Sequence, residues 1–71
     1  MAVNAERLER ALFEARPYVE YWERLENLVR ELWNEATDEK NFLQLLNEEF
    51  QRAEEPFRTD LKIFLQKFES L

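Results

Sequence analysis

The side chains of this chain that could do chemistry are carboxylates. Two pairs of glutamates are adjacent in the sequence, Glu48–Glu49 and Glu54–Glu55. Paired carboxylates can act as general acid and base, or bind a metal ion through oxygen. An arginine, however, follows the first carboxylate of each pair by four residues, which is the spacing of a surface ion pair on a helix. We therefore interpret both pairs as parts of a solvated helix face and expect no metal site there.

The residue types that other reactions need are missing. The chain has no Cys, no His and no Gly, and its only aliphatic hydroxyl groups belong to Thr37, Thr59 and Ser70. Nucleophilic triads combine His with Ser or Cys, and phosphate-binding loops need Gly. Di-iron sites in helical bundles pair Glu with His. We predict that the protein is not an enzyme and binds no cofactor.

Apolar residues recur at helical spacing along the whole chain. In the first half, the steps alternate between three and four residues, which is the pattern of an apolar seam on a helix. The second half repeats this pattern from Leu43 to Leu71, with a shift of phase beside Pro56. A chain of this length and pattern predicts one all-α domain, 1–71. The seam of the first half consists of Leu8, Ala11, Ala15, Tyr18, Trp22, Leu25, Val29, Leu32 and Ala36.

Prolines and capping residues divide the chain into segments. Asn4 can cap a first helix, and Thr37 or Asp38 can cap another helix where the seam pauses. Pro17 and Pro56 can each kink one long helix or stand in the first turn of a new one, and both alternatives remain open. We predict an antiparallel helical hairpin with proline-interrupted arms, which reverses near residue 38 and assembles as a helical bundle. Its expected helical segments are 5–16, 17–36, 39–55 and 56–70.

The apolar face of the first half is wider than a single hairpin can cover. Leu12, Val19 and Trp33 flank the seam on one side, and Tyr21 and Leu28 flank it on the other. A small chain without a disulfide is only marginally stable alone. We therefore expect a protein partner, first of all a second copy in a homodimer. The predicted partner-binding residues are the aromatic and apolar residues of this half: Phe13, Tyr18, Tyr21, Trp22, Leu28 and Trp33.

Two residues do not fit the helical pattern. Phe13 falls opposite the seam, so it is either a partly exposed aromatic residue or a sign that residues 5–16 swing away at Pro17 or meet a second subunit. Glu26 occupies a position that is apolar in neighbouring turns. It either reaches solvent at the edge of the apolar face or forms an ion pair inside an interface.

Charge and hydropathy narrow the classes of partner. The net charge is −6, so nucleic acid phosphates and anionic lipids repel the chain, and we expect neither a nucleic acid nor a membrane partner. No apolar run exceeds three residues, which is far too short to span a bilayer. With no cysteine and no visible export signal, we expect a cytoplasmic protein.

These features predict a non-enzymatic protein–protein interaction module, a small regulator or adaptor that acts through an aromatic-rich helical surface. Trp and Tyr are the residues most enriched at interface hot spots, which favours this interpretation. The alternative is an acidic mimic of nucleic acid that inhibits a DNA-binding protein. The arginines interspersed among the glutamates count against such a mimic, because they interrupt any phosphate-like row of charge.

Overall fold

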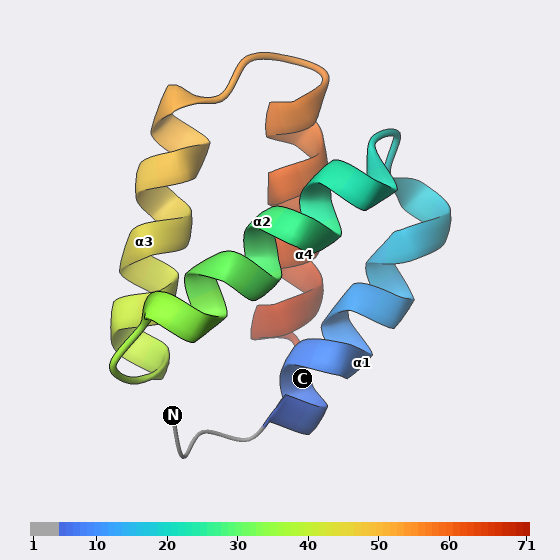
Figure 1. The fold of residues 1–71 in the computed structure, drawn as a ribbon. Helices are drawn as coiled ribbons and strands as arrows, with labels where there is room; N and C mark the ends of the chain where they lie inside the picture. The colour runs from blue at the N-terminus through green and yellow to red at the C-terminus, as the bar shows by residue number, and fades with distance from the viewer. Residues whose placement is uncertain (1–4) are drawn as a thin grey trace.

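A computed structural model describes residues 5–71 as four α-helices joined by short connections (Figure 1). No strand occurs in this range, so the predicted all-α fold is confirmed. The expected cap at Asn4 lies outside the described residues. In chain order, the elements are α1 (Ala5–Ala15), a 3-10 turn (Arg16–Tyr18), α2 (Trp22–Glu35), α3 (Glu39–Arg52) and α4 (Phe57–Glu69).

Both prolines mark ends of helices. Pro17 lies in the 3-10 turn, and α2 begins only at Trp22, so this helix starts later than the expected residue 17. Pro56 occupies the N-cap position of α4, after a cis peptide bond. The two alternatives for the prolines are thereby decided, because each proline separates two helices. The apolar seam keeps its three-and-four spacing through Pro17, although the helix is interrupted there.

The reversal between α2 and α3 occurs where the sequence predicts it. Asp38 caps α3, and its carboxylate accepts a hydrogen bond from the backbone N–H of Asn41 at 2.7 Å. The backbone N–H of Ala36 closes the last turn of α2 by donating to Leu32. A good N-cap contributes about 1 kcal/mol to a helix, so the three-residue connection both ends one helix and starts the next.

The four helices form a hairpin with bent arms. α1 packs along α4 more extensively than any other pair, α2 packs along α3, and α4 also contacts α2 and α3. Figure 1 shows that α1 and α2 meet at an angle after the 3-10 turn rather than forming one straight arm. The predicted antiparallel hairpin is therefore present, and the bend lets a single chain enclose its own core.

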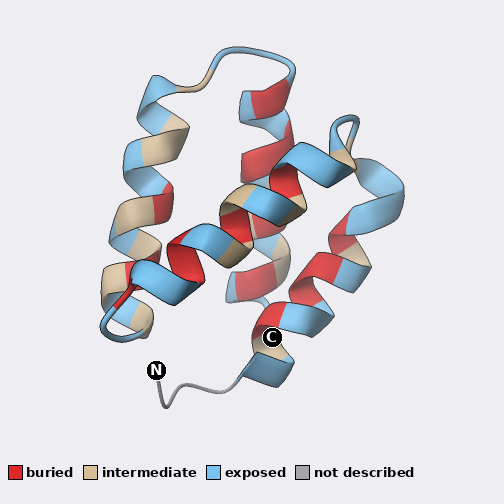
Figure 2. Cartoon of the chain, in the orientation of Figure 1, coloured by how far each residue is buried: buried red, intermediate tan, exposed pale blue. Residues whose placement is uncertain are grey.

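The core runs through all four helices (Figure 2). Its centre is aromatic: the ring of Trp33 meets that of Phe42 edge-on at 5.1 Å between centroids, and Phe64 and Phe68 pack around them. Edge-to-face aromatic contacts add to the stabilisation that comes from burying apolar area. The other buried apolar residues are Leu8, Ala11, Leu12, Ala15, Leu25, Val29, Leu32, Ala36, Leu46, Phe57 and Leu61.

Asp60 is the one buried charged residue among the described residues, at 2% exposure. From α4, its carboxylate accepts the backbone N–H groups of Glu20 and Tyr21 at 2.9 and 2.8 Å. These N–H groups stand at the start of α2, where a helix lacks internal acceptors. Asp60 therefore fixes the start of α2 to α4 and sets the angle after Pro17.

Arg7 makes a second cross-link, at the opposite end of α4. Its guanidinium donates two hydrogen bonds to the backbone carbonyl of Phe68, at 2.9 and 3.1 Å, and pairs with Glu39 at the start of α3. It also lies 4.3 Å from the centroid of the Phe68 ring. A cation at a helix C-terminus satisfies free carbonyl groups, so this side chain joins three helices at one point.

Candidate interaction surface

One carboxylate of each adjacent glutamate pair is occupied by a local contact. Glu49 forms an ion pair with Arg52. Glu55 accepts hydrogen bonds from the hydroxyl and the backbone N–H of Thr59, and the hydrogen bond from the hydroxyl is the main reason why the pKa of Glu55 lies below its usual value. Across residues 5–71, no group of three or more acidic side chains is arranged to hold a metal ion.

The structure separates the six predicted partner-binding residues. Trp33 is only 8% exposed and belongs to the aromatic core, which corrects its expected place on the surface. It was predicted at the flank of the seam, but the bend at Pro17 lets α1 and α4 cover that flank. Tyr18 points elsewhere, with the Lys67 ammonium 4.9 Å from its ring centroid.

Phe13 and Trp22 are the two predicted residues that the structure brings together. They line a hollow of about 130 Å³ between α1 and α2, with Leu12 and Arg16 beside them. Phe13 is 77% exposed, whereas Trp22 is half-buried and packs against the core. The guanidinium of Arg16 lies 5.3 Å from the Trp22 ring, within the range of a cation–π contact. We call Leu12, Phe13, Arg16 and Trp22 the α1–α2 surface.

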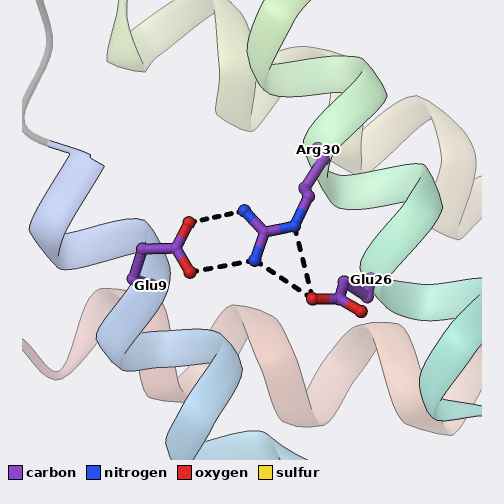
Figure 3. A network of polar contacts seen from close by, with 3 residues as sticks. All are labelled: Glu9, Glu26 and Arg30. Atoms are coloured by element: carbon purple, nitrogen blue, oxygen red, sulfur yellow. Dashed lines mark hydrogen bonds and ion pairs between the residues drawn. The ribbon is translucent and has the colours of Figure 1, made fainter.

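An ion network borders this surface (Figure 3). Arg30 of α2 reaches across to Glu9 of α1 with two hydrogen bonds, the longer of them 2.9 Å, and it also donates to Glu26. The hydrogen bond from Arg30 lowers the pKa of Glu9, and the two carboxylates raise the pKa of Arg30. Glu26 therefore forms an ion pair within the chain, at the rim of the α1–α2 surface.

A larger hollow lies elsewhere, between α2 and α3. It measures about 660 Å³. We call it the α2–α3 groove. Tyr21, another predicted residue, lines a neighbouring hollow at the end of this groove, beside Pro56 and Phe57. The α2–α3 groove is lined by Glu23, Arg24, Asn27, Leu28, Glu31, Glu49, Arg52, Ala53 and Phe57.

Several features of these surfaces were not visible at the level of sequence. In five places of the sequence a glutamate precedes an arginine by four residues. Of these pairs Glu26–Arg30 forms, but Arg52 pairs with Glu49 instead of Glu48. Arg24 and Arg58 lie over the rings of Phe57 and Phe50. The spacing shows that two side chains can meet, but a nearby aromatic ring offers arginine a competing partner.

One signal in the sequence could have revealed Asp60. It stands three residues after Phe57 and four before Phe64, and therefore on the apolar face of α4. An acidic residue on such a face requires buried donors.

A family model matches residues 5–71, a range that contains every helix. The chain belongs to the MJ1579 family. No curated protein and no solved structure matches the chain. The match to the MJ1579 family thus spans all four helices. The surfaces described above are the observations that bear on function. Among the described helices, none is both long enough and apolar enough to cross a bilayer.

Proposed function

We propose that this protein is a non-enzymatic protein–protein interaction module, a small regulator or adaptor that self-associates through the α1–α2 surface. The observation that carries the proposal is Phe13, a large apolar side chain that is 77% exposed although the core of the chain is otherwise well covered. Burying one such side chain contributes about 1.5–3 kcal/mol, which is a strong anchor for a small interface.

The hollow beside Phe13 suits an aromatic ring. Its volume is about 130 Å³. An engineered apolar cavity of about 150 Å³ in another protein binds benzene, so a hollow of this size can receive most of one ring. Trp22 and Leu12 supply the apolar contacts, and Arg16 can stack on an incoming ring as it does on Trp22. Phe13 of one copy can thus pack against the α1–α2 surface of another.

The mixture of positive and negative side chains near the hollow also supports another copy of this chain as the main partner. Arg10 and Glu14 stand on α1, Arg16 follows them in the 3-10 turn, and Glu26 borders the hollow. In a two-fold dimer, each residue meets a different residue of the other copy, so a surface with both signs can be complementary to itself. An acidic chain without such a mixed patch would repel its own copies.

The alternative of a nucleic-acid mimic has less support. Several carboxylates are already paired with arginine inside the chain, among them Glu9, Glu26, Glu39 and Glu49. Such pairs neutralise charge that a row of phosphate-like groups would need. A mimic would also bind its target with a steep dependence on salt, as DNA does.

Sedimentation equilibrium tests the proposal. At micromolar to millimolar concentrations, the wild-type protein should show an average mass above the 8.8 kDa of one chain. F13S should remain monomeric with an unchanged circular dichroism spectrum, because the side chain makes few contacts within the chain. Y18S is the matched control, since Tyr18 is also exposed, at 64%, but lies away from the hollow. A monomeric wild-type protein, or equal loss of association in both variants, would contradict the proposal.

A further inference from the structure

We propose that the α2–α3 groove binds a basic amphipathic helix of a partner protein. This inference rests on the proposed function as an interaction module, and it assigns a second surface and the chemistry of what that surface receives. It is independent of the α1–α2 surface, because the two hollows have no lining residue in common.

The groove has the shape of a wedge. α2 and α3 meet at the short connection of residues 36–38 and diverge from there, while α4 passes behind α2 (Figure 1). The hollow lies toward the diverging ends, since it reaches from Glu31 back to Glu23 on α2 and from Glu49 to Ala53 on α3. Its volume of about 660 Å³ lies within the range of ligand-binding clefts, ~300–1,000 Å³. A third helix can therefore lie between the two diverging helices.

The floor of the groove is apolar. Phe57, at the first turn of α4, is buried, and Leu28 and Ala53 are half-buried against the core. The guanidinium of Arg24 lies 3.9 Å from the centroid of the Phe57 ring, which holds this cation inside the groove. Leu28 of α2 and Ala53, which follows α3, thus offer apolar contact to one incoming apolar ridge, and Phe57 lies beneath the Arg24 side chain.

The α2 wall of the groove is acidic. Glu23, Asn27 and Glu31 follow one another at four-residue intervals, so they form one row along the helix. Glu23 and Glu31 are exposed, and neither forms an ion pair with any described residue. They stand eight residues apart, which corresponds to about 12 Å along the helix axis.

The opposite wall adds little charge. On α3, Arg52 is paired with Glu49, so these two side chains neutralise each other. Arg24 stacks on Phe57 and keeps its positive charge. Three carboxylates and two guanidinium groups line the groove, so its net charge is −1, and the two unpaired carboxylates stand in one row on α2.

These features indicate which kind of partner fits the α2–α3 groove. A partner helix with Lys or Arg at positions i and i+7 spans two turns, which is close to the separation of Glu23 and Glu31. Apolar residues at i+1, i+4 and i+8 lie on the adjacent face of that helix and then point toward Leu28 and Ala53. A second copy fits less well, because each copy carries a net charge of −6 and the exposed faces of its helices are rich in glutamate. Complementary charge favours a basic partner.

A designed peptide of about 18 residues, or five helical turns, serves as the probe. Leucines form its apolar stripe, and lysines flank the stripe at i and i+7. Two further peptides separate charge from shape: one has glutamate in place of each lysine, and the other is a scrambled sequence of the same composition. Isothermal titration calorimetry gives the affinity, and amide chemical shifts of the ¹⁵N-labelled protein locate the site. Only the amphipathic lysine peptide should bind, with shifts at Leu28, Ala53 and Phe57.

Charge reversal on the protein sharpens the test. E23K/E31K should weaken binding of the lysine peptide by about tenfold or more, because two attractions become repulsions. E20K/E69K is the matched control, because both glutamates are exposed, form no ion pair with a described residue and do not line the groove, and the change in net charge is the same; it should bind nearly as tightly as the wild type. Equal weakening in both double variants would show attraction to the net charge of the protein and would overturn the proposal, as would equal binding of the scrambled peptide.

Repeating the titration with F13S separates this inference from the proposed function. Unchanged peptide binding in F13S is expected, because Phe13 is not part of the groove. If F13S abolishes self-association while no peptide binds the groove, the α1–α2 surface stands and the groove proposal fails. If the peptide binds the groove and the protein never self-associates, the proposed self-association is contradicted and the groove proposal stands.

Discussion

The two ends of the space between α2 and α3 differ sharply. At the closed end, beside residues 36–38, Trp33 and Phe42 pack edge-to-face and both are buried, Phe42 completely. At the open end, Phe57 is covered by an arginine side chain rather than by another ring, and Leu28 and Ala53 are only half-buried. The same two helices therefore build a core at one end and a groove at the other.

The difference follows from the contacts that position α2 at each end. The three-residue connection and its Asp38 cap keep the helices together at the closed end, so aromatic side chains can interlock. At the open end, α2 is held by Asp60 to α4 and not to α3. On that side the contact of α3 is with α4, where Arg58 lies over the ring of Phe50, and α2 stands apart from α3. Stability thus concentrates at the closed end, and binding surface at the open end.

The largest effect is expected from truncation at the closed end. F42A should destabilise the protein by about 3–5 kcal/mol, because it leaves a cavity among Trp33, Phe64 and Phe68. F50A is the comparison on the open side of α3, where the half-buried ring contacts Arg58, and it should cost much less. Urea denaturation measures both. Equal losses would contradict the division between a rigid end and an open end.

A smaller effect is expected at the Asp60 cross-link. D60N keeps one acceptor but places an amide N–H₂ group against a backbone N–H, so it should cost about 1–3 kcal/mol. D38N is the matched control, because asparagine caps a helix as well as aspartate does. Amide hydrogen exchange should become faster at Glu20 and Tyr21 in D60N. Unchanged protection there would show that other contacts set the start of α2.

The smallest effect concerns Glu9, which joins α1 to α2. Arg30 lowers its pKa below the ordinary value of 4.5, so the ion pair stabilises the folded state above that pH and is lost as pH falls through the lowered pKa. E9Q should therefore reduce stability by less than about 1 kcal/mol near pH 7, since the pair is largely exposed.

Below the lowered pKa of Glu9, E9Q and the wild type should be equally stable. Denaturation curves across this pH range give the comparison, with E14Q as the control for a pair within one helix. A difference that persists in acid would mean that Glu9 acts by packing and not by charge.

The fold could be predicted from the sequence because the local signals for helices and helix ends agree with one another. The seam spacing, Pro17, Asp38 and Pro56 each act within one or two helical turns, and each marks an element that the structure contains. The surfaces were harder to predict because they depend on the angle between helices. Trp33 has the spacing of a flank residue, but the bend at Pro17 places it in the core. Leu28 lines a groove because α2 and α3 diverge from their short connection.

The two tryptophans allow the most direct test of the central claim, since Trp22 lines the α1–α2 surface and Trp33 lies in the core. Their indole N–H groups give two separate signals in a ¹⁵N-labelled sample, which can be followed as the protein is diluted from millimolar to micromolar concentration. Self-association through the α1–α2 surface predicts that the Trp22 signal moves with concentration while the Trp33 signal stays in place. Two stationary signals, or movement of Trp33 alone, would contradict it.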